Sequence, residues 1–414
     1  MADRVLVLGD DVRAFLGVVR SLGRRGLEVH VAPTDGAAPA LHSRYIAATQ
    51  NLPAYATNPA AWEAALRKLI ADFDYRMIVP CSDASLVQLQ HHSRSFGRDR
   101  LALPNPQAFA VFTDKRRTRQ LAKSVGVAVA PGQGLTAKDD ARDLARRYGF
   151  PLLLKPVKSY RLGDPHDKRA VEMLRDVAAL EQAMSEEAWR DCLVEGFFAG
   201  EGLGVSVVAR CGRIVSFYQH RRLQQFTETG VSTSRVSERV DDALRRDVER
   251  LAAAVSLDGV AMFEFRRNTQ TGEHVLLEVN PRFWGSLPLA LAAGADFPAM
   301  IYDQLRGGSV AAAPYRAGMV KRDLSGEYER RVIRAEAAAG LSERLYWSAA
   351  ALLTPVALSR GEADSWAEDD PAPYFAERRE LLERIRDAVG KRLRVRSSSR
   401  ATRAVPGRHR LRSA

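Results

Sequence analysis

Two consecutive stretches in the second half of the chain each carry a glutamate inside an apolar run that is typical of a buried β-strand. They are "GVAMFEFRRN" (259–268), which contains Glu264, and "EHVLLEVNP" (273–281), which contains Glu278. Only the short polar segment "TQTG" separates them. Two β-like stretches joined by a short segment containing glycine predict an antiparallel hairpin. The chain should therefore contain at least one antiparallel sheet with acids inside it.

Pairing of these strands would bring three oxygen-bearing side chains together. Glu278 and Asn280 lie two positions apart and so share one face of their strand, and Glu264 would join them from the partner strand. A buried carboxylate without a partner costs several kcal/mol, so the cluster predicts a bound cation. Oxygen-only ligands suit Mg²⁺, with Mn²⁺ as the alternative ion. The competing interpretation is that the two glutamates pair with arginines such as Arg266 and Arg282.

Two lysines upstream favour the metal interpretation. Lys115 stands at the start of a basic helix, and Lys155 follows an apolar run in "PLLLKPV" (151–157). Each lysine alone is more typical of a solvated surface position. Together with an acid cluster that binds Mg²⁺, they are typical of a site that holds a polyphosphate.

The N-terminal stretch predicts a parallel, doubly wound α/β unit. "RVLVLGDD" is typical of a buried strand, "VRAFLGVVRSLGRRG" of an amphipathic helix and "LEVHVAP" of a second strand. The residues after Gly9 do not match G-x-G-x-x-G, which disfavours a dinucleotide site. A further strand, "YRMIVPCSD", ends in Ser82 and Asp83. Open α/β sheets bind ligands at such strand ends, and a helix N-cap is the alternative role.

Composition and charge narrow the remaining choices. The chain has 414 residues, enough for two or three domains. Its formal charge of +12 is concentrated in residues 391–414, which hold nine Lys and Arg and no acid, so the rest of the chain carries about +3. This tail is expected to be disordered, and contact with anionic lipid or RNA remains open beside a purely solvated role. No DNA partner is expected.

Three widely spaced cysteines predict a reducing, cytoplasmic setting. The longest apolar run late in the chain, "WSAAALLTPVAL" (347–358), is too short to span a membrane. It favours a packing helix over membrane contact.

Five segments together resemble one known family. "DK" (114–115), "LLLKP" (152–156), "LVEGFFAGEGLGVSV" (193–207), "FEF" (263–265) and "LLEVNPRFWGS" (276–286) occur in the order and at roughly the spacing of the ATP-grasp superfamily. The last segment is most similar to the carbamoyl-phosphate-synthase-like branch. The resemblance covers about residues 1–310.

The resemblance implies a mixed α/β and α+β architecture in five parts. They are a doubly wound parallel-sheet domain (1–110), a small lobe (111–192), a large lobe with the metal site (193–310), a mostly helical extension (311–390) and the basic tail (391–414).

The resemblance also implies how ATP is held. Lys115 and Lys155 would contact the phosphates, with Lys155 also near the adenine. Residues 195–198 would form the hinge between the lobes, where backbone groups of Glu195 and Phe198 read the base. Phe197 and Phe198 offer apolar surface to a flat ring. Glu201 would bind the ribose hydroxyls.

The remaining implied roles concern the reaction. Glu264, Glu278 and Asn280 would hold one or two Mg²⁺ ions between the phosphates. Arg282 would lie beside the transferred phosphate and the substrate carboxylate, where a planar guanidinium matches an oxyanion. Together with Lys155 it is the candidate catalytic residue.

The segment "QHRRLQQFTETGVSTSR" (219–235) is the second candidate substrate region. By strand alternation, His220 and Arg222 share one face and Arg221 takes the other. Ser232 is a candidate anion donor together with its neighbours Gly230 and Ser234, and a plain turn is the alternative. Ser82, Asp83, His220, Arg222 and Ser232 are therefore the candidate substrate residues.

The resemblance implies a carboxylate–amine ligase that uses ATP and Mg²⁺ to form an acyl phosphate, with small-molecule carboxylate and amine substrates. A carbamate-forming carboxylase and a small-molecule kinase remain alternatives on the same site. A non-catalytic nucleotide-binding protein with a basic tail is the alternative from another class. A homodimer is the default assembly for such a chain.

Overall fold

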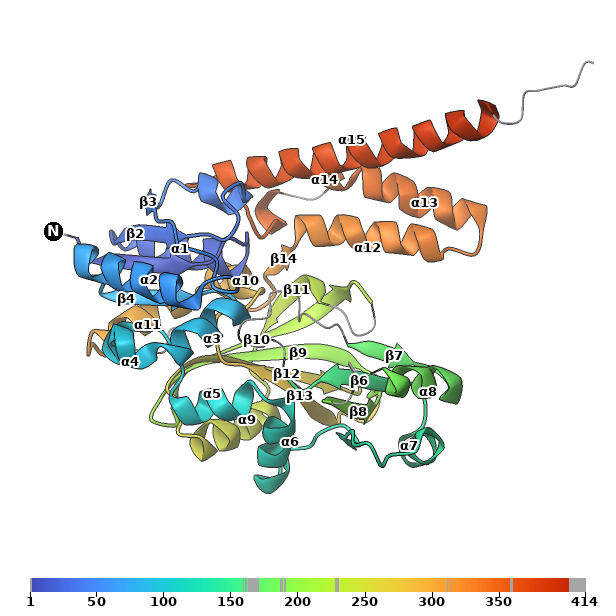
Figure 1. The fold of residues 1–414 in the computed structure, drawn as a ribbon, viewed down its shortest axis with the longest axis horizontal. Helices are drawn as coiled ribbons and strands as arrows, with labels where there is room; N and C mark the ends of the chain where they lie inside the picture. The colour runs from blue at the N-terminus through green and yellow to red at the C-terminus, as the bar shows by residue number, and fades with distance from the viewer. Residues whose placement is uncertain are drawn as a thin grey trace, which may run out of the picture.

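The N-terminal part of the chain forms a four-stranded parallel sheet in the order β3-β2-β1-β4 (Figure 1). Its strands are β1 (Arg4–Leu8), β2 (Glu28–Ala32), β3 (Ile46–Thr49) and β4 (Met77–Pro80). Side chains of β1 alternate between two cores: Val5 and Val7 pack with helix α1 (Ala14–Arg24), and Leu6 and Leu8 pack with α2 (Pro59–Phe73). The expected doubly wound parallel unit is confirmed.

Short helices complete this domain and connect it to the next. They are η1 (Pro39–His42), α3 (Asp83–His91), α4 (Ser93–Phe96), η2 (Arg98–Arg100) and α5 (Pro106–Phe112). The expected domain boundary at residue 110 falls inside α5. Helix α5 packs against α6 (Lys115–Ser124) and β13 (His274–Asn280), so it contacts the parts of the fold that carry the candidate site.

A second, smaller sheet is antiparallel and has the order β5-β8-β6-β7. Its strands are β5 (Gly132–Gly134), β6 (Leu152–Pro156), β7 (Glu172–Leu174) and β8 (Cys192–Gly196), and it packs with α7 (Ala141–Tyr148) and α8 (Val177–Ser185). The expected lobe boundary at 192/193 cuts through the start of β8. The small lobe continues to Gly196, because β8 pairs with both β5 and β6.

The largest sheet has six antiparallel strands in the order β13-β12-β9-β10-β11-β14. They are β9 (Glu201–Arg210), β10 (Arg213–Gln225), β11 (Ser232–Glu238), β12 (Gly259–Arg267), β13 and β14 (Val320–Arg322). One face packs against α5, α6 and α9 (Asp242–Ala254). Part of the other face meets the N-terminal domain, α10 (Leu287–Ala293) and α11 (Phe297–Leu305). The sheet thus joins the domains and leaves part of one face to line a cleft.

The C-terminal extension is mostly helical, as expected, but its β14 also forms one edge of the large sheet. Its helices are α12 (Leu324–Ala337), α13 (Leu341–Leu352), α14 (Thr354–Ala357), η4 (Arg360–Glu362) and α15 (Ala372–Ala401). Helix α15 runs along the top of the molecule, and the α12–α13 hairpin projects beneath it (Figure 1). The tail expected to be disordered from residue 391 begins inside α15, which continues to Ala401.

The computed structural model describes residues 2–401 apart from residues 159, 161, 163–170, 187, 188, 190, 228–230, 311, 313, 358 and 359, with backbone only for residues 391–401. Among these described residues, no helix combines the length and apolar character needed to cross a membrane.

Candidate active site

The predicted hairpin forms, and it brings the three predicted metal ligands together. Strands β12 and β13 pair with Glu264 opposite Glu278 and Met262 opposite Asn280. The Asn280 Nδ2 lies 3.4 Å from the Glu264 Oε1 and 3.3 Å from the Glu278 Oε1. One amide therefore bridges two carboxylates on a single face of the sheet.

Each carboxylate also has a cationic partner. Arg222 of β10 donates to Glu264, and the Lys115 Nζ lies 3.7 Å from the Glu278 Oε2. The alternative that these glutamates pair with arginines holds for Glu264, but its partner is Arg222 and not Arg266 or Arg282. The Arg266 guanidinium instead lies 5.1 Å from the centre of the Phe197 ring.

Burial and these partners shift the pKa values of the two glutamates in opposite directions. Burial raises the pKa of Glu264, and the nearby charge of Arg222 offsets this only in part. Burial also acts to raise the pKa of Glu278, but Lys115, the hydrogen bond from Asn280 and Lys155 together outweigh it and lower that pKa. The positive charge of the two lysines therefore favours the ionised form of Glu278.

A second buried ion cluster ties the small lobe together. Lys155 of β6 pairs with Glu195 of β8, and the Arg119 Nη1 donates to the same carboxylate at 2.6 Å. All three side chains are less than 10% exposed. The Glu195 side chain is thus engaged inside the lobe. Arg119 was not among the residues predicted from the sequence, although it lies four residues after Lys115 on α6 and therefore on the same helix face.

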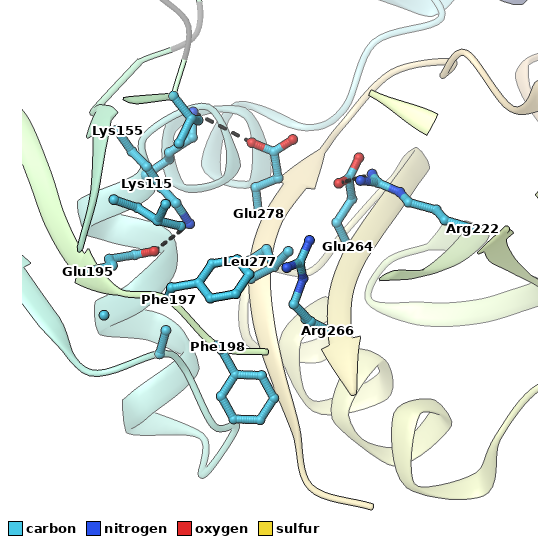
Figure 2. A pocket seen from close by; sticks show the side chains of 14 residues that line it. Lys115, Lys155, Glu195, Phe197, Phe198, Arg222, Glu264, Arg266, Leu277 and Glu278 are labelled. Atoms are coloured by element: carbon cyan, nitrogen blue, oxygen red, sulfur yellow. Dashed lines mark hydrogen bonds and ion pairs between the residues drawn. The ribbon is translucent and has the colours of Figure 1, made fainter. Parts of the chain in front are cut away.

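A pocket between the two lobes connects these clusters (Figure 2). Lys115, Lys155, Glu264 and Glu278 form its polar side. Its apolar wall consists of Ala130, Leu153, Phe197, Phe198 and Leu277. The pocket therefore combines an apolar slot at the hinge with lysines and carboxylates at its other end.

The end of β13 is linked to the N-terminal domain by an ion pair. The Arg282 Nε and Nη2 donate to the two carboxylate oxygens of Asp83 at 2.5 and 2.9 Å. Burial would lower the pKa of Arg282, but Asp83 outweighs it and the net shift is upward. Asp83 and Asn280 line a further small pocket that shares Lys115 and Glu278 with the first.

Ser82 has the alternative role expected for it. It caps α3 in a reciprocal capping box, in which its hydroxyl accepts from the Ser85 backbone N–H and its own N–H donates to the Ser85 hydroxyl. This cap fixes the start of the helix that carries Asp83. Ser82 does not line the pockets described above.

Glu201 is not brought together with the other predicted ATP-binding residues. The register sets its neighbour Gly202 against Arg222 and Arg266 on the cleft face, so Glu201 lies on the opposite face. Its carboxylate accepts from Arg267 at 2.5 and 2.9 Å. Glu201 is absent from the lining of the pocket.

The candidate substrate residues of β10 are arranged as the alternation predicted. His220 packs over Gly204 and Arg222 over Gly202, so they share the cleft face, whereas Arg221 bonds to Glu238. His220 is 2% exposed, and burial lowers its pKa well below the usual value.

The expected anion donors on the following strand are arranged differently. Ser232 donates to the backbone oxygens of Gln224 and Ser234, so its hydroxyl is engaged within the sheet. Gly230 lies outside the described residues.

The oxygen donors of the β12–β13 hairpin fit a hard divalent cation. Two carboxylates and one amide share a face, and the Asn280 amide bridges them. Among the described residues, no group of three or more His, Cys, Asp and Glu side chains is placed to hold a metal ion. A cation held here would therefore need the amide oxygen and ligands from outside the chain, a pattern that Mg²⁺ tolerates.

Comparison with known proteins gives a family match in this part of the chain. Residues 188–325 match a family model described as "ATP-grasp in the biosynthetic pathway with Ter operon". The matched segment contains β9 to β13 and both glutamates. Residues 188–325 therefore match the ATP-grasp family.

Similarity to a curated protein extends over about half of the chain. The large chain of carbamoyl phosphate synthase from Thermoanaerobacter pseudethanolicus is 22% identical over 221 residues, which cover 51% of this chain and 20% of that protein. The chain thus matches about a fifth of the length of this relative.

Two solved structures share the ATP-grasp fold of the chain. L-amino acid ligase from Bacillus licheniformis has a TM-score of 0.56 at 16% identity, with 73% of this chain and 74% of that one covered. The biotin carboxylase domain of Hydrogenobacter thermophilus 2-oxoglutarate carboxylase, solved with MgADP, ADP and bicarbonate, has a TM-score of 0.59 at 16% identity, with 76% and 73% covered.

Proposed function

We propose that this chain is an ATP- and Mg²⁺-dependent ligase that activates a small-molecule carboxylate as an acyl phosphate and joins it to an amine. The observation that carries the proposal is the single pocket in which Lys115 and Lys155 face Glu264 and Glu278 beside an apolar hinge. This arrangement suits a nucleotide whose base enters the apolar slot and whose phosphates reach the charged end.

The residues of the pocket have distinct proposed tasks in holding ATP. Phe197, Phe198 and Leu277 provide apolar surface for the base. Lys115 and Lys155 neutralise phosphate oxygens, and both start from carboxylate partners that keep them in place. Glu201 is not included among these residues, because its side chain lies on the other face of the sheet and is bonded to Arg267.

Glu264, Glu278 and Asn280 would hold Mg²⁺, which when bound neutralises charge on the β- and γ-phosphates. For Glu264 to act as a ligand, its contact with Arg222 must be exchanged for the cation. Arg222 then becomes available on the cleft face next to the phosphates, where a guanidinium matches an oxyanion.

The proposed chemistry proceeds in two displacement steps. A carboxylate oxygen of the substrate attacks the γ-phosphorus, the bond between that phosphorus and the bridging oxygen breaks, and ADP leaves. An amine nitrogen then attacks the acyl carbon, loses a proton, and displaces phosphate to leave an amide. Arg282, held by Asp83 at the end of β13, is placed to orient the carboxylate. No side-chain nucleophile is required.

Two features of other proteins support the proposal. The fold is shared with an L-amino acid ligase. It is also shared with a biotin carboxylase domain solved with MgADP and bicarbonate, so a carboxylase that uses bicarbonate is the second candidate.

Product analysis tests the proposal and separates it from its rivals. The protein is incubated with ATP, Mg²⁺ and pooled carboxylic acids and amines, and nucleotides and products are identified by mass spectrometry. We expect ADP, phosphate and a product with the combined mass of acid and amine less one water. ADP with a phosphorylated product would indicate a kinase, and turnover that depends on bicarbonate would indicate a carboxylase. Formation of AMP with pyrophosphate would contradict an acyl phosphate intermediate.

A further inference from the structure

The C-terminal extension carries most of the exposed large apolar side chains in the described part of the chain. Ten of the fourteen lie between residues 333 and 389, and the four most exposed of those ten are Leu341 (72%), Tyr346 (66%), Val356 (63%) and Leu345 (60%). Soluble monomers seldom gather so many exposed apolar groups in one place, and such patches mark surfaces that bind something. The expectation of a packing helix at 347–358 therefore holds for one side of this segment only.

Five of these side chains, from Leu341 to Leu353, lie on one side of helix α13 and its C-terminal end. At about 100° per residue, Leu341, Leu345 and Leu352 fall within roughly 40° of one another, and Tyr346 and Leu353 widen this surface to a sector of roughly 140°. We call these five residues, together with Val356 of the short helix α14 that follows, the apolar face. The opposite side of α13 packs on α12, where Arg330 and Arg334 lie over the Trp347 ring at 5.8 and 5.6 Å. The apolar face therefore points away from the rest of the protein.

The apolar face lacks charge, whereas the chain that follows it is strongly basic. Between Leu345 and Ala357 there is no charged residue. Residues 391–414 carry nine Lys and Arg and no acid, and they begin within α15, which runs beside the α12–α13 hairpin (Figure 1). An apolar surface combined with a polybasic segment is the pair of signals that gives stable binding to an anionic lipid surface.

We propose that the C-terminal extension docks on the surface of an anionic lipid bilayer, with the apolar face of α13 entering the headgroup region and residues 391–414 contacting the lipid charges. The proposal is independent of the reaction assigned to the pocket. A second copy of the chain would cover the apolar face equally well but would gain nothing from the basic segment, because the two identical segments repel each other. RNA would attract the basic segment but leave the apolar face exposed.

Sedimentation of the full-length protein with vesicles tests the proposal. Vesicles of phosphatidylcholine alone are compared with an equal mixture of phosphatidylcholine and phosphatidylglycerol. We expect the protein to sediment with the mixed vesicles, to remain in solution with the neutral ones, and to be released as salt is added. Equal partitioning to both vesicles, or no binding to either, would overturn the proposal.

Variants of the two signals make the test specific. Leu345→Ser combined with Leu352→Ser should reduce partitioning at least fivefold, and Arg392→Gln, Arg394→Gln and Arg396→Gln together should do the same. Glu343→Asp is the matched control, since it keeps the charge of an exposed side chain that lies on the same helix but off the apolar face. Circular dichroism checks that each variant is folded.

The competing occupants give different results. If light scattering shows a dimer that Leu345→Ser with Leu352→Ser converts to a monomer, and wild type does not bind vesicles, the apolar face is a subunit interface and the proposal is wrong. Binding to RNA but not to anionic vesicles overturns it as well. Loss of vesicle binding in both variant sets, with Glu343→Asp unaffected, supports it.

Discussion

Glu264 and Glu278 lie directly opposite each other in the β12–β13 hairpin, and the pKa of the first is raised while that of the second is lowered. Both are affected by burial, but Glu278 also has Lys115, Asn280 and Lys155 near it. Two carboxylates this close together could share one divalent cation once Glu264 exchanges its ion pair with Arg222. This relationship is the basis of the proposed metal site.

Substitution of Glu278 should abolish turnover. Glu278→Gln keeps the size and shape of the side chain but removes the charge that a divalent cation needs. We expect Mg-ATP turnover to fall by roughly a hundredfold or more, with an unchanged circular dichroism spectrum. Glu273→Gln, exposed in the turn of the same hairpin, is the control that should retain activity. Turnover at the wild-type level in Glu278→Gln would rule out the metal assignment.

Substitution of Arg222, the guanidinium that pairs with Glu264, should raise the affinity of the site for Mg²⁺. Arg222 competes with a bound ion for that carboxylate, and a unit charge a few ångströms away is worth about 1 kcal/mol or more. Arg222→Gln should therefore bind Mg²⁺ severalfold more tightly in the absence of nucleotide, as measured by calorimetry. Arg221→Gln alters the neighbouring residue on the opposite face, which bonds to Glu238, and should leave Mg²⁺ affinity unchanged. Weaker Mg²⁺ binding in Arg222→Gln would contradict the proposed exchange of partners.

Two substitutions in the buried cluster of the small lobe should affect stability and nucleotide binding separately. Glu195→Gln leaves Arg119 and Lys155 buried without a countercharge, which should cost about 3–5 kcal/mol of unfolding free energy. Lys155→Met leaves Glu195 paired with Arg119, so its main effect should be a loss of ATP affinity of about tenfold or more. Chemical denaturation and nucleotide titration measure the two quantities. Equal ATP affinity in Lys155→Met and wild type would remove Lys155 from the proposed site.

A buried carboxyl in the C-terminal extension should make stability depend on pH. Burial, followed by the charges of Asp323 and Asp364, raises the pKa of Glu377 to about 7, and Ser365 and Ser325 donate to it. The folded protein thus binds this proton more tightly than the unfolded chain does. The stability contributed by the proton is fully present below the unfolded pKa of 4.5 and is lost as the pH rises toward 7.

Glu377→Gln isolates this effect. The variant should melt at a higher temperature than wild type at pH 8, with a gain of up to roughly 3 kcal/mol, and should match wild type near pH 4.5. Thermal denaturation across this pH range measures the difference. A constant difference between the two proteins at all pH values would show that Glu377 does not titrate in this window.

The hairpin and the N-terminal sheet were predictable because local patterns determine them. Alternation in a strand fixes which side chains share a face, so Glu264, Glu278 and Asn280 could be placed together from sequence. The same rule placed His220 and Arg222 correctly. The parallel order of β1 and β2 followed from the strand–helix–strand pattern.

Contacts between distant segments were not predictable in this way. The alternative partners proposed for the glutamates were Arg266 and Arg282, whereas the structure uses Arg222 and Lys115. Those pairs depend on how β10 and α6 pack against the hairpin, which no local pattern encodes. The role of β14 as an edge of the large sheet was missed for the same reason, because it pairs with β11 from far along the chain.

Trapping of the intermediate tests the proposed reaction most directly. The protein is incubated with ATP, Mg²⁺, pooled carboxylic acids and hydroxylamine, which converts an acyl phosphate into a stable hydroxamate. We predict that wild type forms ADP and a hydroxamate of one acid, and that Glu278→Gln forms neither. Formation of AMP and pyrophosphate, or of ADP without any hydroxamate, would contradict activation of a carboxylate as an acyl phosphate at this site.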